Sequence, residues 1–321
     1  MLHLLFNQET KMFGDRVVPG ESALFIMNHR TRLDWMFLWS PLMAFETLSQ
    51  LKVILKNDLK LVPGVGWAMQ LNNFIFLHRK WEVDKDILTR MLSHVRSVGR
   101  PTQLLLFPEG TDFEPRTKAR SDNFAKKNNL PIYDYVLHPR TTGFSFCVNH
   151  MVNHKQIDAI YDVTIAYPKS ILQNELGMVT GAVPEEIHFN IRRYPLQQLA
   201  QEVDLTSEEE ISNWCNERWK EKEQSLAHFY SASGNRKFPR SSSDDSSQSA
   251  TANGHPAIAV KTHLYPLMWA SAIFWTGSVI MQLYLVFTST ICFYYTLFLM
   301  ALYAVATFRG GMEIMESSLI R

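Results

Sequence analysis

A stretch of 45 residues without a charged side chain constrains this sequence more than any other feature. Between Leu264 and Phe308 there is no Asp, Glu, Lys or Arg, and large apolar residues dominate. A helix that crosses a membrane needs about 20 such residues, so the stretch has room for two helices and a tight turn near residues 288–290. Two buried helices of a soluble protein are the alternative, but soluble helices rarely run so far without a charge. We therefore expect a transmembrane helical hairpin.

Basic residues flank the uncharged stretch on both sides. Lys261 precedes it and Arg309 follows it. Because Lys and Arg accumulate on the cytoplasmic side of membranes, these flanks predict that both ends of the hairpin face the cytosol. The cysteines are widely spaced and odd in number, which argues against a disulfide framework or a CxxC metal site and indicates a reducing compartment. They are Cys147, Cys215 and Cys292.

Averages over the whole chain describe an ordinary soluble protein. The 321 residues carry 32 Lys and Arg against 31 Asp and Glu, and the mean hydropathy is −0.12. Such values exclude collagen-like, wholly disordered and multi-span transporter classes. A net charge of +1 gives no indication of nucleic-acid binding, so no nucleic acid is expected as a partner. An anionic partner would have to be bound by a local cluster of cations.

The Ser-rich stretch from Ser231 to Pro256 has few residues that could form a core. Such a stretch cannot bury enough apolar surface to offset the entropy of ordering, so it predicts a flexible linker. The sequence therefore divides into a folded domain over residues 12–230, a linker over residues 231–260, and a membrane hairpin with a short tail over residues 261–321.

Four short apolar runs in the folded domain each end in polar side chains. The runs cover residues 23–27, 74–77, 104–107 and 135–137, and an amphipathic stretch over Asp84–Val98 separates two of them. Strands that alternate with helices predict an α/β fold with a mostly parallel sheet and flanking helices. Ligands bind beyond the carboxyl ends of such strands, so we expect the four polar clusters to meet along one edge.

The first cluster places a histidine, His29, five residues before an aspartate, Asp34. On a continuous helix these side chains would point about 140° apart, so contact requires His29 in a loop and Asp34 in the first helical turn. Asp34 would then bind one ring nitrogen, and the other nitrogen would remove a proton from a hydroxyl. The alternative is that Asp34 caps the helix and His29 is an ordinary buried histidine.

The second cluster places a carboxylate and a glycine at a strand end, in Phe107-Pro108-Glu109-Gly110-Thr111. Gly110 would let a ligand approach the main chain, and Glu109 and Thr111 would bind an acceptor that carries a hydroxyl. A plain Pro-Gly turn is the alternative.

Four arginines are expected on the same edge of the sheet. Guanidinium groups suit bidentate binding of phosphate, although a solvated basic surface is an equally simple interpretation. These residues are Arg30, Arg32, Arg79 and Arg140.

Taken in order, the clusters resemble the four motifs of the glycerolipid acyltransferase family. The motifs are N-H-x4-D at residues 28–34, FIFLHR at 74–79, FPEGT at 107–111, and a later strand that ends at His138-Pro139. The longer strings NHRTRLDWMFLW, VPGVGWAMQ and LLLFPEGTD look most like the lysocardiolipin acyltransferase branch of that family. The resemblance covers most of residues 14–230.

This resemblance implies roles for the residues named above. His29 would be the general base and Asp34 its partner, while Arg79 and the Glu109-Gly110-Thr111 group would bind the acceptor. Acyl-CoA would donate the acyl chain to the free hydroxyl of a lysophospholipid, without a metal ion, a cofactor or a covalent acyl-enzyme. The acceptor stays open between lysocardiolipin, lysophosphatidylinositol, lysophosphatidylglycerol and lysophosphatidic acid. The family also implies an integral protein of the endoplasmic reticulum whose catalytic domain faces the cytosol.

The sequence departs from the family pattern after the second cluster, and two other functions stay open. Many relatives have an arginine after Glu-Gly-Thr to bind the acceptor phosphate, whereas this chain has Asp112. Phosphate binding would then depend more on Arg79 or on neighbouring cations. A Ser-His-Asp hydrolase is disfavoured because no G-x-S-x-G motif occurs. A membrane-tethered scaffold or lipid-binding protein without catalytic activity is the other alternative.

Overall fold

The computed structural model describes residues 8–173, 177, 181–232, 238 and 265–319. The chain divides into two compact units. Among the described residues, the first contains 54–100 and 265–319, and the second contains 8–53, 101–173, 177, 181–232 and 238. Apart from residues 231, 232 and 238, the predicted linker over residues 231–260 lies outside the described residues.

Strands of the chain form a mostly parallel sheet, as the sequence predicts. The strand order is β1-β7-β6-β2-β5-β3-β4, and among these described strands only β6 and β7 pair in the antiparallel sense. The first residues of β3 belong to the second unit and pair with β5, and its last residues belong to the first unit and pair with β4. The strands are β1 (Glu9–Gly14), β2 (Ala23–Met27), β3 (Leu51–Lys56), β4 (Ile75–Leu77), β5 (Gln103–Leu106), β6 (Ala159–Ala166) and β7 (Glu186–Pro195).

Three of the four predicted strands are present, and the fourth is wrong. β2, β4 and β5 match the first three apolar runs, and every residue of β2 and β5 is buried. Residues 135–137 instead lie in a loop. The backbone N–H groups of residues 134–136 donate to the carboxylate of Glu223, at 2.6, 2.9 and 3.1 Å. Because this side chain takes up the donors, no neighbouring strand is needed to satisfy them.

Helices of the second unit flank the sheet. α10 packs against α7 and β6, and the hydroxyl of Ser207 caps its first turn by accepting from the N–H of Glu210. The helices are α2 (Asp34–Phe37), α3 (Trp39–Ala44), η1 (Leu48–Gln50), α6 (Pro115–Lys127), α7 (Thr141–Asn153), α9 (Leu196–Glu202) and α10 (Glu208–Ser231).

The first unit combines β4 with helices from both ends of its sequence. α5 contains the amphipathic stretch predicted over residues 84–98, and it ends at Gly99, whose φ of 68° is favourable for glycine. The helices are η2 (Asn57–Leu61), α4 (Val65–Leu71), α5 (Trp81–Val98), α11 (Tyr265–Thr288), α12 (Thr290–Phe308) and α13 (Met312–Leu319).

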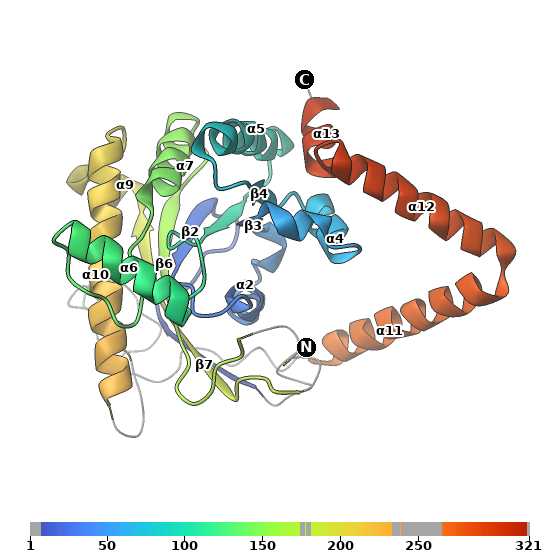
Figure 1. Cartoon of the computed structure of the whole chain (residues 1–321), viewed down its shortest axis with the longest axis horizontal. Coiled ribbons are helices and arrows are strands. Elements are labelled where there is room, and N and C mark those ends of the chain that lie inside the picture. The colour runs from blue at the N-terminus through green and yellow to red at the C-terminus, as the bar shows by residue number, and fades with distance from the viewer. Residues whose placement is uncertain (1–7, 174–176, 178–180, 233–237, 239–264, 320–321) are drawn as a thin grey trace. The chain divides into compact units, whose positions relative to one another are not determined.

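Helices α11 and α12 form the hairpin that the sequence predicts (Figure 1). The chain turns at Ser289, whose side chain caps α12 by accepting from the N–H of Cys292. Residues 269–288 and 290–308 are long and apolar enough to cross a membrane, and of these residues only Ala306 and Thr307 are buried. A soluble protein would bury such surfaces, so the two helices indicate association with a membrane.

A buried ion pair joins α10 to the sheet. Lys222 is only 2% exposed, and its ammonium group donates to the carboxylate of Asp162 in β6. It also donates to the carbonyl of Val163 at 2.7 Å and to the hydroxyl of Thr164 at 3.2 Å. The ammonium group therefore satisfies its donors inside the protein, which a buried charge requires.

Removal of Lys222 should destabilise the protein strongly. In Lys222→Met the carboxylate of Asp162 stays buried without its partner, and we expect a loss of about 3–5 kcal/mol in the free energy of unfolding. Chemical denaturation of the detergent-solubilised chain measures this loss. Lys220→Met is the matched control, because Lys220 is exposed on the same helix and should change stability little. Equal effects of the two substitutions would contradict the interpretation.

Candidate active site

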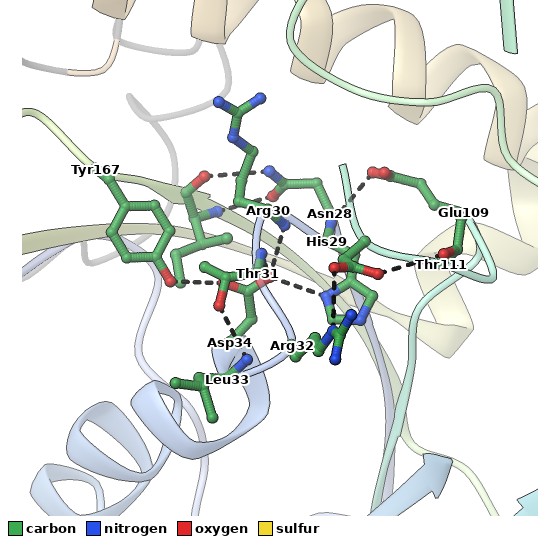
Figure 2. A network of polar contacts seen from close by, with 12 residues as sticks. Asn28, His29, Arg30, Thr31, Arg32, Leu33, Asp34, Glu109, Thr111 and Tyr167 are labelled. Atoms are coloured by element: carbon green, nitrogen blue, oxygen red, sulfur yellow. Dashed lines mark hydrogen bonds and ion pairs between the residues drawn. The ribbon is translucent and has the colours of Figure 1, made fainter. Parts of the chain in front are cut away.

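The structure brings His29 and Asp34 together. His29 follows the carboxyl end of β2, and Asp34 is the first residue of α2. Nδ1 of His29 lies 2.9 Å from Oδ2 of Asp34 (Figure 2). Asp34 does not cap the helix, because Leu33 occupies the N-cap position and no side chain caps this end. The structure therefore has the contact that the sequence predicts, with the histidine in a loop and the aspartate in the first helical turn, and it does not have the alternative in which Asp34 caps the helix.

The carboxylate of Asp34 accepts hydrogen bonds from four donors. Besides the ring of His29, the backbone N–H groups of Arg30 and Thr31 donate to Oδ2 at 2.6 and 2.9 Å. The hydroxyl of Tyr167 donates to Oδ1 at 2.6 Å. Asp34 is fully buried, and a buried carboxylate with four donors acts only as an acceptor. Nδ1 of His29 therefore donates to Asp34, and in the neutral ring this leaves the lone pair on Nε2.

Tyr167 is a site residue that the sequence analysis missed. It directly follows β6, the parallel neighbour of β2, so it reaches the same edge of the sheet as His29. Burial, and the nearby charge of Asp34, raise the pKa of the Tyr167 hydroxyl well above its usual range, so this group stays a donor. The sequence held only a weak signal, because residues 159–166 include Asp162 and Thr164 and only Ile165 and Ala166 form an apolar pair directly before Tyr167.

Asn28 fixes the start of the loop over residues 28–33, which connects β2 to α2. Its amide group donates to the carbonyl of Ile165 at 3.1 Å and accepts from the N–H of the same residue at 2.8 Å. The backbone pairing of β2 with β6 extends to Met27 and Val163, so the side chain of Asn28 continues the ladder beyond the strand. His29 therefore begins from a backbone position that β6 holds.

Glu109 supports the main chain of His29. Its Oε1 accepts from the N–H of His29 at 3.3 Å and from the indole N–H of Trp219 at 3.3 Å. Burial raises the pKa of Glu109 to about 8, although the donors from Leu137, His29 and Trp219 and the charge of Arg30 act in the opposite direction. The group is therefore mostly protonated at neutral pH. Binding of the acceptor by Glu109 stays a prediction of the sequence.

Trp219 is a second residue that the sequence analysis missed. It lies on α10, and the ammonium group of Lys222 lies 5.2 Å from the centre of its ring. The helical spacing of Ile211, Cys215 and Trp219 indicates a buried face, but nothing in that spacing identifies Glu109 as the partner. α10 thus supports the His29 loop through a side chain that is distant in sequence.

Phe107 and Phe113 contact His29, whereas Gly110 and Thr111 contact neighbouring residues. The ring of Phe107 stacks on the imidazole with centroids 4.1 Å apart, which fixes the ring plane. The N–H of Phe113 donates to the carbonyl of His29 at 2.7 Å. Gly110 has a φ of 71°, and a Cβ atom there would lie 3.6 Å from Cδ of Arg140. Thr111 donates its hydroxyl to Asp112 at 3.3 Å.

The structure gathers three of the four predicted arginines on the second unit. Arg30 is half-buried, donates to the carbonyl of Tyr135 at 3.0 Å, and lies 4.5 Å from the centre of the Phe113 ring. Arg140 is exposed and lies beside Gly110. Arg79 follows β4 in the first unit and is exposed.

Arg32 lies next to the position at which the sequence departs from the family pattern. Its guanidinium group is 3.7 Å from the carboxylate of Asp112 and 3.7 Å from that of Glu114, and the side chain of Arg32 is more than half exposed. Arg32 therefore lies within ion-pair distance of Asp112, the residue that follows Glu-Gly-Thr in this chain. Binding of phosphate by Arg32 stays a prediction.

Cys147 and Cys215 are not arranged as nucleophiles. Burial raises the pKa of the Cys147 thiol to about 12 and raises that of Cys215 as well, so both stay protonated at neutral pH. Within the described ranges, no three His, Cys, Asp or Glu side chains are grouped as metal ligands. The expectation of a site without a metal ion stays a prediction.

Comparison with known proteins identifies the family. Residues 10–168 match the model of a family described as "Acyltransferase", and residues 177–263 match "Acyltransferase C-terminus". A "Probable 1-acyl-sn-glycerol-3-phosphate acyltransferase 5" of Arabidopsis thaliana is 34% identical over 285 residues, which are 88% of this chain and 71% of the relative. The chain belongs to the acyltransferase family. Trp219 and Lys222 lie in the second matched region, and His29, Asp34, Glu109 and Tyr167 lie in the first.

Two animal members of the acyltransferase family are more similar in sequence. "Lysocardiolipin acyltransferase 1" of Mus musculus is 48% identical over 238 residues, which cover 74% of this chain and 62% of the mouse protein. "Lysophosphatidylinositol acyltransferase 10" of Caenorhabditis elegans is 42% identical over 244 residues, which cover 74% and 61%. The chain thus spans about three fifths of the length of these two relatives.

The buried carboxyl group of Glu109 should make stability depend on pH. The unfolded chain releases this proton near the ordinary value of 4.5, whereas the folded chain holds it to about pH 8. Between these limits the unfolded state binds fewer protons, so the free energy of unfolding falls as the pH rises. Glutamine cannot ionise, and its carbonyl oxygen can accept the same two hydrogen bonds. We expect Glu109→Gln to remove this part of the decrease in melting temperature between pH 5 and pH 8.

Thermal unfolding of the full chain in detergent at several pH values tests this expectation. Glu217→Gln is the matched control, because Glu217 is an exposed glutamate on α10 and its replacement should leave the pH dependence unchanged. An equal decrease in the melting temperatures of Glu109→Gln and of the wild-type protein over this range would contradict the interpretation that Glu109 is buried in its protonated form.

Proposed function

We propose that this protein transfers a fatty acyl chain from acyl-CoA to the free hydroxyl of a lysophospholipid. The observation that carries the proposal is the hydrogen bond between Nδ1 of His29 and the buried carboxylate of Asp34. It leaves Nε2 as a base without the need for a third catalytic side chain. Membership of the acyltransferase family, and relatives whose names specify three different lysophospholipids, support the same reaction class.

The proposed reaction needs one proton carrier. Nε2 of His29 takes the proton of the acceptor hydroxyl as the hydroxyl oxygen attacks the thioester carbonyl carbon. The tetrahedral intermediate collapses with cleavage of the C–S bond, and the imidazolium returns the proton to the sulfur of the departing CoA. Asp34 stabilises the imidazolium throughout, and the hydrogen bonds from Arg30, Thr31 and Tyr167 hold Asp34 in place.

An anionic glycerophospholipid is the acceptor that we propose. The relatives are named for lysocardiolipin, lysophosphatidylinositol and 1-acyl-glycerol-3-phosphate, and all three acceptors carry a phosphate group. Arg32 and Arg140 are exposed on the unit that holds His29, so they are the candidate phosphate ligands there. Lysocardiolipin is the first acceptor to test, because the highest identity given above, 48%, is to a relative named for it.

The proposed setting is the membrane of the endoplasmic reticulum, with the active site on the cytosolic side. The apolar hairpin of α11 and α12 supports anchoring in a membrane. Arg309 directly follows α12, and a basic residue at this position favours the cytosolic face. The bilayer would then hold both the enzyme and its lipid acceptor.

Replacement of His29 should abolish most of the transfer activity. We expect His29→Ala to lower kcat by about 10²- to 10⁴-fold, because general base assistance contributes that much. The measurement is the transfer of a labelled acyl chain from acyl-CoA to a panel of lysophospholipids, with the full chain in membranes. His228→Ala is the matched control, since His228 is exposed on α10 and its loss should leave kcat within a few-fold of wild type.

The same assay separates the proposed reaction from its rivals. Release of CoA without acylated lipid would indicate a hydrolase. Wild-type protein that binds lysophospholipid but transfers no acyl chain would indicate a tethered lipid-binding protein or scaffold. Transfer by His29→Ala at the wild-type rate would show that the proposed mechanism is wrong.

Tyr167 should contribute to kcat by positioning Asp34. Tyr167→Phe keeps the aromatic ring that packs against Phe37 but removes the hydrogen bond to Oδ1 of Asp34. Hydrogen bonds to charged groups contribute roughly 1.5–3 kcal/mol, so we expect kcat to fall by about 10-fold or more with little change in the KM for acyl-CoA. Tyr133→Phe, in the loop before residues 134–136, is the control. A rise in KM without a fall in kcat would contradict the positioning role.

A further inference from the structure

One segment of the first unit exposes a group of large apolar side chains. Five of the 13 residues from 59 to 71 are apolar and between 36% and 58% exposed. We name this group the η2–α4 patch; it consists of Leu59, Leu61, Val62, Val65 and Leu71. Single exposed apolar residues are normal, but a group this dense in one segment marks an interaction surface.

The end of α12 is bound to the same segment. The ring of Trp67 stacks on that of Tyr303, with centroids 5.2 Å apart. Gln70 is fully buried, and its amide group donates to the hydroxyl of Thr307 at 3.1 Å. Its carbonyl oxygen accepts from the N–H of Met312 at 3.0 Å. These contacts join α4 to the last turns of α12 and to the first residue of α13.

Two further contacts hold η2 in this arrangement. The ammonium group of Lys60 donates to the carbonyl of Gly310, just beyond α12. α4 packs so closely on η2 that a Cβ atom at Gly66 would lie 2.4 Å from the carbonyl oxygen of Lys60 and 2.6 Å from that of Leu59. The patch and the end of α12 therefore belong to one packed structure.

The length of α12 places its end at the surface of a bilayer. Its 19 residues span about 28 Å at ~1.5 Å per residue, close to the ~30 Å thickness of the hydrocarbon core. The first charged residue, Arg309, follows directly. Tyr303, Thr307 and Gly310 lie in or next to the last turns, so the segment bound to them lies where hydrocarbon meets the lipid head groups.

We infer that the η2–α4 patch inserts into the interfacial layer of the bilayer, and that lipid covers its five apolar side chains. The inference rests on the proposed placement of the hairpin in a membrane. Apolar side chains on a helix at this depth bury themselves among the upper parts of the acyl chains, which offsets the cost of their exposure. The enzyme would then contact the membrane through the hairpin and also through η2 and α4. The contacts of Gln70 and Lys60 with the end of α12 would set the depth of these two helices in the bilayer.

Depth-dependent fluorescence quenching tests this inference with the full chain in vesicles of neutral and anionic phospholipids. Cys292 is replaced by Ser, and Cys147 and Cys215 are buried, so one introduced cysteine can carry an environment-sensitive fluorophore. The test positions are Leu61→Cys and Val65→Cys. Phe298→Cys, near the middle of α12, reports the hairpin, and Lys85→Cys, exposed on α5, is the aqueous control. Nitroxide lipids carry the quencher either near the head group or deep in the acyl chain.

The expected pattern differs between the positions. Labels at residues 61 and 65 should be quenched at least about twofold more by the shallow nitroxide than by the deep one, and the label at residue 298 should show the opposite order. The label at residue 85 should be quenched little by either.

Two other patterns would overturn the inference and distinguish its parts. Deep quenching at residue 298 with none at residues 61 and 65 would leave the hairpin in the membrane and reject the η2–α4 patch as a lipid contact. A blue shift at residues 61 and 65 without quenching would assign the patch to a protein surface, such as a second copy of the chain. No quenching at residue 298 would reject both the membrane placement and the inference that depends on it.

Discussion

The rest of the site depends on the hydrogen bonds that the buried carboxylate of Asp34 accepts. A fully buried charge is costly unless donors surround it, and here the donors come from the loop after β2 and from Tyr167 after β6. The two strands must therefore be neighbours, and the loop must turn so that its N–H groups point inward. The same geometry leaves the other ring nitrogen of His29 without a hydrogen bond to Asp34. One set of hydrogen bonds thus satisfies the buried carboxylate and also orients the His29 ring as the proposed mechanism requires.

A second group of buried side chains supports the loop that follows β2. Glu109 accepts from the main chain of His29, and Trp219 of α10 donates to the same oxygen. Lys222, one helical turn further on, packs over Trp219 and pairs with Asp162 of β6. α10 belongs to the region that matches the C-terminal family model, so that region contributes directly to the support of the loop that holds His29.

Two contacts that the sequence analysis did not predict share a physical cause. The run at residues 135–137 was expected to be a strand because it is apolar, but the carboxylate of Glu223 binds the backbone N–H groups there. Glu109, whose binding of the acceptor stays a prediction, accepts from the indole N–H of Trp219. Both contacts depend on side chains of α10, about 90 to 110 residues away. Local patterns record which groups are polar or apolar but not which distant groups will satisfy them.

The amino-acid sequence alone determined the features that depend on contiguous residues. The length of the uncharged stretch predicts the α11 and α12 hairpin, since membrane-spanning helices follow from apolar length. The spacing of His29 and Asp34 allows their contact only through a turn into a helix, and that turn is present. Only the tertiary structure decided that Tyr167 and Trp219 complete the site. Their partners follow from the order of strands in the sheet and from the packing of α10, because buried polar groups bind whichever donors the fold brings near them.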